Sequence, residues 1–379
     1  MKKDRRQLPS ASPRGTHLVA VSDTGPTWTD ELRRSITSVA ELADHLELTE
    51  DERQGAERAE QAGLPIAITP YYLSLADPFD PRCPIRRQCV PHIAEDREVP
   101  GDMVDPLGEE AHEVAPDLVC RYPDRALLLV SDRCSVYCRF CTRSRMVGAG
   151  GGVRTLEHLA PALTWLAEHP EVRDVIVSGG DPLVMSTERL SRVLERLRTI
   201  PSIETIRLAT RVPVTLPSRV TGELVEALRA YHPIWVMTHF NHPQELTERA
   251  REACIRLVDA GFPVMNQTVL LRGINDDKET LEKLFRGLVR WRVRPYYLLQ
   301  ADPVRGTSHL RTPIESGLRL MEDLQGRLSG IALPKLIVDA PGGLGKVPIL
   351  PDYVVKRLPG RTVLRTFRGT EVEYVDPPA

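Results

Sequence analysis

Three cysteines lie within eight residues in the stretch SDRCSVYCRFCTRSR, as Cys134, Cys138 and Cys141. Thiolates spaced C-x3-C-x2-C on a loop can converge on one metal centre, and soft sulfur ligands favour an iron–sulfur cluster or zinc. Structural zinc takes four ligands, and no second C-x-x-C pair or nearby histidine completes such a set. Three thiolates on a [4Fe–4S] cluster would leave one iron open for an outside ligand. Zinc, or cysteines that bind no metal, remains the alternative on spacing alone.

A second motif, SGGD, consists of Ser178, Gly179, Gly180 and Asp181 at the end of an apolar run. Two glycines allow the backbone to approach a ligand closely, and a carboxylate can accept a charge-assisted hydrogen bond. Taken alone, the same residues would more often form a turn with a helix cap. The position of the motif one strand and one helix after the cysteines makes it a candidate ligand loop.

Near the C-terminal end, Lys346 follows a glycine-rich stretch in VDAPGGLGKVPILPDY. A phosphate-binding loop of the form G-x-x-x-x-G-K-[ST] is excluded, because Ala340 occupies the first glycine position and Val347 follows the lysine. An isolated Gly-Lys in a turn is usually a solvated lysine. The rest of the sequence therefore has to decide what this lysine does.

Short apolar runs that alternate with amphipathic segments must position these motifs. The runs are 126–131, 174–180, 204–210, 234–240, 263–271 and 294–300, and the helical segments are 156–169, 187–199, 221–231, 246–261 and 278–291. Continuous apolar runs between helices indicate buried parallel strands. Six such repeats predict an α/β fold with an open (β/α)6 barrel, and a doubly wound sheet is the alternative. In either fold, ligands bind at the carboxyl ends of the strands.

The remaining segments suggest four parts of the chain. Residues 1–25 are expected to form a flexible tail, and residues 26–125 a helical and irregular wrap. Within the wrap, the stretch from Trp28 to about Glu60 reads as helical with Thr49 as an N-cap, and residues 64–125 read as irregular. Residues 126–330 form the core, and residues 331–379 form a C-terminal segment that carries Lys346.

The composition excludes several classes of partner. The 379 residues carry a formal net charge of -2, so a nucleic-acid partner is not expected. No apolar run approaches the about 20 residues of a membrane helix, and the basic start lacks the apolar stretch of a secretory signal. Seven cysteines, an odd number, argue against a disulfide framework. We therefore expect a cytoplasmic protein with no membrane contact.

The cysteine array after the first strand of a βα repeat resembles the radical S-adenosylmethionine superfamily, and Tyr137 matches the aromatic residue that the superfamily places before the second cysteine. The resemblance implies a [4Fe–4S] cluster on the three cysteines. The free iron of that cluster would bind the methionine amino and carboxylate groups of S-adenosylmethionine. It also implies that the SGGD loop receives the methionine amino group.

Residues 64–368 resemble the lysine 2,3-aminomutase family more specifically. The matching blocks follow in order as ITPYYLSLADP, RYPDRALLLVSDRCSVYCRFCTR, VRDVIVSGGDPL, THFNHPQELT, NQTVLLRGIND, RVRPYYLLQAD and VDAPGGLGKVP. The family implies that Lys346 forms a Schiff base with pyridoxal phosphate, as a nucleophilic lysine can. Arg121, Tyr122 and Arg125 would anchor that cofactor, although arginines in a loop could equally be solvated charges.

The resemblance also implies the residues that hold the substrate. Arg143 would bind the α-carboxylate, and Asp302 and Asp339 would bind the distal cation, although either aspartate alone could be a cap or a surface charge. Two carboxylates facing one ammonium favour L-lysine and disfavour glutamate, while arginine or another cationic amino acid remains open. His239 and Gln267, at strand ends, match contacts to S-adenosylmethionine, although they could be satisfied core polar groups.

Two departures from the family bear on the assembly and the pocket. Some members hold an intersubunit zinc with a cysteine where this chain has Asp276, so a structural zinc is not expected. An aromatic residue of some relatives is Leu299 here, which could reshape the pocket. We expect a homo-oligomer and a one-electron reductant such as flavodoxin or ferredoxin. The competing hypothesis, a non-catalytic iron–sulfur or zinc scaffold, is disfavoured because the cysteines, Asp181 and Lys346 are all present.

Overall fold

The computed structural model describes residues 27–62, 64–148 and 151–377. The predicted tail, residues 1–25, lies outside these ranges. In the described ranges no helix is long and apolar enough to cross a membrane.

Ten strands form one sheet in which the strands follow each other in sequence order. They are β1 (Glu113–Ala115), β2 (Leu118–Tyr122), β3 (Arg125–Ser131), β4 (Asp174–Gly179), β5 (Thr205–Ala209), β6 (Ile234–Thr238), β7 (Val264–Leu270), β8 (Arg294–Gln300), β9 (Lys335–Ala340) and β10 (Gly345–Pro348). Strands β3 to β9 pair in parallel, and β1, β2 and β10 extend the two edges antiparallel. The edges do not meet, so the barrel is open as predicted, with β9 as an additional parallel strand.

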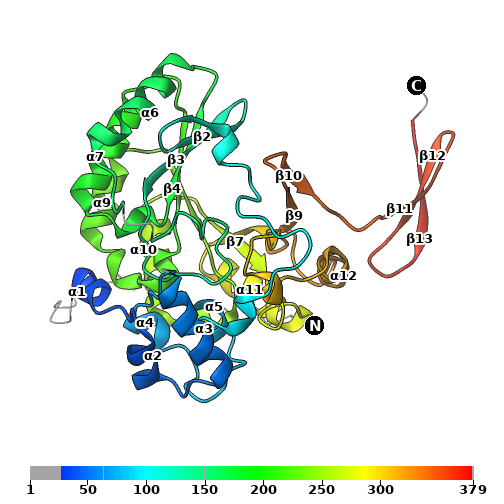
Figure 1. Ribbon diagram of the computed structural model, residues 1–379. Helices are drawn as coiled ribbons and strands as arrows, with labels where there is room; N and C mark the ends of the chain where they lie inside the picture. Colours follow the sequence, from blue (N-terminus) through cyan, green and yellow to red (C-terminus); the bar gives the residue numbers. More distant parts are fainter. Residues whose placement is uncertain (1–26, 63, 149–150, 378–379) are drawn as a thin grey trace, which may run out of the picture.

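Helices connect the parallel strands and cover the outer face of the sheet (Figure 1). They are α6 (Leu156–Glu168), α7 (Thr187–Arg198), α9 (Gly222–Arg229), α10 (Glu248–Asp259), α11 (Lys278–Arg290) and α12 (Ile314–Leu324). Each of the first five begins after a serine, threonine or aspartate whose side chain accepts a hydrogen bond from a first-turn backbone N–H. These caps satisfy donors that the helix itself leaves free. The strands and helices predicted from periodicity are therefore confirmed.

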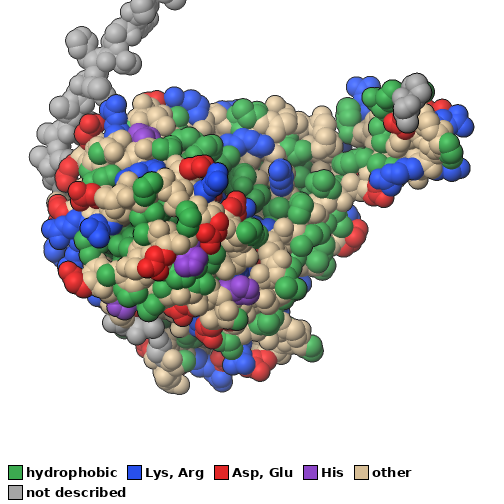
Figure 2. All heavy atoms as spheres, turned by 90° about the horizontal axis from the view of Figure 1, so that it is seen from above, with side chains coloured by type: hydrophobic (Ala, Val, Ile, Leu, Met, Phe, Trp, Pro, Cys, Tyr) green, Lys and Arg blue, Asp and Glu red, His purple; other side chains and the backbone are tan. Residues whose placement is uncertain are grey.

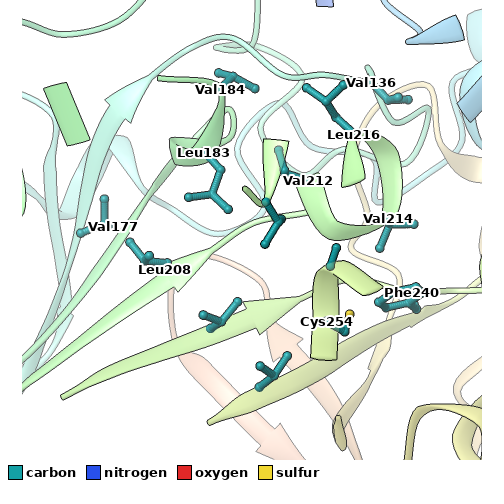
Figure 3. Close-up of a cluster of buried hydrophobic side chains, with 14 of the residues drawn as sticks. Val136, Val177, Leu183, Val184, Leu208, Val212, Val214, Leu216, Phe240 and Cys254 are labelled. Carbon is teal, nitrogen blue, oxygen red and sulfur yellow. The ribbon is translucent and has the colours of Figure 1, made fainter. Parts of the chain in front are cut away.

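Short helical turns after the strands pack on an apolar cluster between sheet and helices (Figure 3). The turn η3 (Pro182–Val184) follows β4, and α8 (Val212–Thr215) follows β5. Leu183 and Val212 are buried against Val177 and Leu208 of the strands beneath them. Because this cluster fixes both turns, it also fixes the loops at the carboxyl ends of β4 and β5.

The stretch that the sequence predicted to be helical contains three helices. They are α1 (Trp28–Arg33), α2 (Val39–His45) and α3 (Glu50–Gln61). Thr49 caps α3 as predicted. Its hydroxyl accepts a hydrogen bond from the Glu52 N–H, and the Glu52 carboxylate accepts one from the Thr49 N–H. The Glu52 carboxylate also accepts two 2.6 Å hydrogen bonds from Arg86, and both side chains are buried. This pair joins α3 to the segment that follows.

Residues 64–125 contain only short elements between irregular stretches. They contain α4 (Pro70–Leu73), α5 (Arg86–Cys89), η1 (Ile93–Asp96) and η2 (Glu110–His112), and they supply β1 and β2. These elements could not be located from the sequence, because they are three to five residues long and carry no detectable period.

The C-terminal part supplies β9 and β10 to the main sheet and then forms a separate three-stranded sheet. Its strands are β11 (Val354–Leu358), β12 (Arg361–Arg365) and β13 (Glu371–Val375), all antiparallel. This sheet, here called the arm, projects from the body of the molecule (Figures 1 and 2).

Candidate active site

A cavity of about 340 Å³ lies at the carboxyl ends of the parallel strands. Residues at alternating positions of the strands point into it, because successive side chains of a strand face opposite sides of the sheet. The residues predicted to hold the cofactors and the substrate all line this cavity: Arg121, Tyr122, Arg125, Cys134, Cys138, Cys141, Arg143, Ser178, Gly179, Gly180, Asp181, His239, Gln267, Asp302, Asp339 and Lys346. The fold therefore brings together motifs that are more than 200 residues apart.

The three cysteines occupy the loop after β3, close enough for their thiols to influence one another. Burial, together with a neighbouring thiol, raises the pKa of Cys141 to about 11 and that of Cys134 well above its ordinary value. A bound metal would reverse this, since coordination deprotonates a thiol outright. The guanidinium of Arg211 donates to the Cys138 sulfur at 2.8 Å. The loop thus offers three sulfurs with a fixed positive charge beside one of them.

Within the described ranges, no group of three or more His, Cys, Asp or Glu side chains converges on a position for a single metal ion. A cubane cluster does not require such convergence, because each of its thiolates binds a different iron. The residues present therefore fit the cluster that the cysteine spacing suggested.

Gly179 and Gly180 bring the SGGD loop into backbone contact with the cysteine loop. A Cβ atom on Gly180 would lie 2.2 Å from the carbonyl oxygen of Arg133, and one on Gly179 would lie 2.1 Å from that of Ser131. The Gly180 N–H donates to the Ser131 carbonyl at 2.5 Å, and the Asp181 N–H to the Arg133 carbonyl at 2.8 Å. The glycines are thus required for the close approach of two protein loops, whereas the sequence suggested approach to a ligand.

The carboxylate of Asp181 is occupied by hydrogen bonds within the protein. Its oxygens accept from the Leu183 N–H at 2.9 Å, the Thr210 hydroxyl at 2.7 Å and the Arg211 N–H at 2.7 Å. Burial raises its pKa to about 6 despite these donors. Asp181 caps η3 and joins the loops after β4 and β5, which is the capping role that the isolated motif suggested.

His239 directly follows β6, and Gln267 lies within β7. Both side chains line the cavity. Burial, together with the Arg211 charge, lowers the pKa of His239 to about 3, so the imidazole is neutral near pH 7. Its Nε2 atom is buried and has no hydrogen-bond partner among the described residues. Leaving a buried polar atom without a hydrogen bond costs free energy, so a ligand that forms a hydrogen bond with this nitrogen would be stabilised.

Lys346 lies on β10 directly opposite Asp339 on β9. Its ammonium pairs with the Asp339 carboxylate, whose other oxygen is 3.3 Å from an Arg121 nitrogen, and its backbone N–H donates to the Tyr122 hydroxyl at 2.8 Å. The glycine-rich stretch before it is the turn of a β-hairpin. A phosphate-binding loop leads into a helix, so its exclusion on sequence grounds agrees with this geometry.

The remaining candidates line the same cavity as the lysine. The Arg125 guanidinium lies 4.6 Å from the centre of the Tyr122 ring. Burial, with a smaller contribution from the nearby Asp339 carboxylate, raises the pKa of Asp302 to about 6. Arg143 lines the same cavity from the segment after the cysteines.

Sequence reasoning missed Arg207, Arg211 and Tyr297, which also line the cavity. Arg207 and Tyr297 lie on β5 and β8, and Arg211 follows β5. A polar side chain at the end of a predicted strand is a signal for a cavity residue, and Arg211, directly after the run 204–210, carries that signal.

Comparison with known proteins gives matches along almost the whole chain. The family model described as Lysine-2,3-aminomutase matches residues 321–379, and that of the Radical SAM superfamily matches residues 128–284. The L-lysine 2,3-aminomutase of Fusobacterium nucleatum is 47% identical over 350 residues, which cover 92% of this chain and 82% of that protein. The corresponding enzyme of Clostridium subterminale is 45% identical over 350 residues, covering 92% and 84%.

A relative with a different printed activity is also similar. The glutamate 2,3-aminomutase of Clostridioides difficile is 40% identical over 367 residues, which cover 96% of this chain and 86% of that protein. Overall identity therefore groups the chain with aminomutases but does not by itself choose among their substrates. The residues around the cavity have to make that choice.

Replacement of Gly180 by alanine should disturb the cysteine loop, because the new Cβ would collide with the Arg133 backbone. We expect a lower iron content after anaerobic reconstitution and a lower melting temperature. Gly222→Ala is the matched control, since nothing lies within 4 Å of its added Cβ. Equal iron content in the Gly180→Ala and Gly222→Ala proteins would contradict the contact described here.

Proposed function

The chain belongs to the lysine 2,3-aminomutase family, and we propose that it converts L-lysine to β-lysine by moving the α-amino group from C2 to C3. It is an isomerase of the radical S-adenosylmethionine type. Its cofactors are a [4Fe–4S] cluster, S-adenosylmethionine and pyridoxal phosphate. One observation carries the substrate assignment: Arg143, Asp302 and Asp339 line the same cavity as Lys346 and the three cysteines.

The candidate residues divide between the cofactors by position. We assign Cys134, Cys138 and Cys141 to the cluster, and the loop Ser178, Gly179, Gly180 and Asp181 with His239 and Gln267 to S-adenosylmethionine. Lys346, Arg121, Tyr122 and Arg125 are assigned to pyridoxal phosphate. Because both oxygens of Asp181 accept protein hydrogen bonds, we assign it the shaping of this loop and leave ligand contact to the backbone of Gly179 and Gly180.

When bound, these cofactors supply radical hydrogen-atom transfer and a carbonyl carbon that holds the migrating amine. They are needed because the β C–H bond of lysine is an unactivated alkane bond that no side-chain base can ionise. The protein must place C3 of the substrate near one cofactor and its amine near the other. It must also keep water and stray hydrogen donors away, and apolar Ile176, Met237, Val269 and Leu299 line the cavity for that purpose.

The charges in the cavity suit a substrate with a carboxylate at one end and a cation at the other. Arg143 offers a planar fork to the α-carboxylate, and Asp302 with Asp339 offers negative charge to the ε-ammonium. Asp339 pairs with Lys346, and its carboxylate would be free to pair with the substrate cation if that lysine held the cofactor. Two carboxylates would repel the acidic side chain of glutamate. The same pair could accept a guanidinium, which keeps arginine as the second candidate.

Turnover decides between these substrates. Reconstituted, reduced enzyme is given S-adenosylmethionine and either L-lysine, L-arginine or L-glutamate, and products are identified by mass spectrometry. We expect β-lysine and neither of the other two β-amino acids. Formation of β-arginine without β-lysine would refute the substrate assignment.

Lys346→Ala should abolish turnover and the visible absorbance of bound pyridoxal while the iron content stays unchanged.

The raised pKa of Asp302 predicts a pH dependence. The carboxylate, not the neutral acid, pairs with the ε-ammonium, so kcat/KM for lysine should fall by about tenfold per pH unit below about pH 6. Asp302→Asn should have a low kcat/KM at every pH and lack this dependence. If the variant retains the wild-type decline below pH 6, another group is responsible.

We further propose a homo-oligomer in which the arm contacts a second copy of the chain. Apolar side chains of the arm are exposed, with Val372 at 49% and Tyr374 at 60% of their surface accessible. Such side chains on a projecting sheet favour coverage by another protein surface. Lysine replacing both Val372 and Tyr374 should lower the mass measured by light scattering, whereas lysine at Glu373, on the opposite face, should not. An unchanged mass in the double variant would exclude the arm as the interface.

Two further properties follow from the chemistry. We propose a cytoplasmic location, where thiols stay reduced. We also propose a one-electron donor such as flavodoxin or ferredoxin, because the cluster would have to be reduced before it could start radical turnover.

A further inference from the structure

Glu109 is a buried carboxylate directly behind Arg143. Only 2% of its surface is accessible. Glu109 directly precedes η2, and its side chain makes no capping hydrogen bond to that helix. One carboxylate oxygen accepts from Arg143 Nε at 2.9 Å and from Nη2 at 2.7 Å, and the other is 3.0 Å from Nε. A buried carboxylate is stable only when paired in this way. Arg143 is therefore its principal partner.

This pairing leaves a defined edge of the guanidinium for a ligand. Glu109 occupies the Nε and Nη2 edge, and among the described residues Nη1 has no hydrogen-bond partner. Arg143 lines the cavity and Glu109 does not. Since the guanidinium is planar, holding one edge fixes the direction in which the other edge points.

The turn that carries Glu109 also packs on the hairpin turn before Lys346. The Gly342 N–H donates to the Pro106 carbonyl at 2.8 Å, and a Cβ on Gly108 would lie 2.9 Å from the Gly342 carbonyl carbon. Arg121 donates to the Leu107 carbonyl at 3.2 Å. One short segment therefore contacts both Arg143 and the hairpin that presents Lys346.

That double contact matches a requirement of an α-amino acid substrate. Its carboxylate and its amine are attached to the same carbon. Arg143, which binds the carboxylate, must therefore keep a fixed position relative to Lys346, beside which the amine must lie. The neighbouring acids do not serve this purpose. Asp105 and Glu110 pair with Arg145, at 3.2 and 3.0 Å, and Arg145 reaches Glu109 only at 3.5 Å.

We propose that Glu109 is a positioning residue that orients Arg143 for the substrate α-carboxylate and holds that grip in register with Lys346. The inference rests on the proposed function only for the role of Arg143. Glu109 touches neither substrate nor cofactor, so it acts through Arg143.

Binding tests this without turnover. Calorimetry on the enzyme loaded with cluster and pyridoxal phosphate, but without S-adenosylmethionine, compares L-lysine with L-lysinamide, which has an uncharged carboxamide. Glu109→Gln keeps the shape but removes the charge, and it should weaken lysine binding by about tenfold or more while changing lysinamide binding by less than about twofold. Glu110→Gln, whose side chain is 74% exposed, should leave both affinities unchanged. Glu109→Asp, which keeps the charge, should recover part of the preference for lysine.

Equal weakening of lysine and lysinamide in Glu109→Gln, or a lower melting temperature with unchanged affinities, would show a merely structural role and overturn the proposal. Wild-type enzyme that does not prefer lysine over lysinamide would overturn it as well. An intact preference in an enzyme that makes no β-lysine would instead count against the proposed function, because the binding measurement does not depend on the reaction.

Discussion

The guanidinium of Arg211 joins the parts of the molecule that must cooperate. It donates to the Cys138 sulfur at 2.8 Å, to Gln88 at 2.6 Å, and to Tyr72 and Glu245 at 2.9 and 2.8 Å. These partners come from the cysteine loop, the N-terminal wrap and the loop after β6. A buried charge is tolerated only when its hydrogen bonds are satisfied, so the position of each partner constrains the others. The wrap is thereby coupled to the cofactor loop.

The same strand end connects to the SGGD loop through the backbone. Asp181 accepts from the Arg211 N–H, and its own N–H donates to the loop that carries Cys134. The cofactor-binding loops after β3, β4 and β5 are therefore held together before any ligand arrives. At the other end of the cavity, the hairpin with Lys346 is held by the turn with Glu109. Because the same turn also holds Arg143 of the cysteine segment, it links the two halves of the cavity.

Much of this arrangement could be predicted from the sequence, since strand and helix periods are local and located β3 to β8 and the helices between them. The cavity residues were found because they lie at strand ends or in blocks that resemble an aminomutase family. What the sequence did not reveal are pairs between distant segments: Glu52 with Arg86, Glu109 with Arg143, and Arg211 with its partners. Such pairs have no period and no fixed spacing, so only the folded chain identifies them. The hydrogen bonds that join Asp181 to the loop after β5 were likewise not visible in the sequence.

The central claim is that the half holding the three cysteines and the half holding Lys346 act on one substrate molecule in one cavity. The most direct measurement is the transfer of hydrogen from substrate to S-adenosylmethionine. L-Lysine deuterated at C3 is supplied, and S-adenosylmethionine is recovered after partial turnover. The account predicts deuterium on the 5′ carbon of the adenosyl group. β-Lysine formed without any deuterium in recovered S-adenosylmethionine would contradict it.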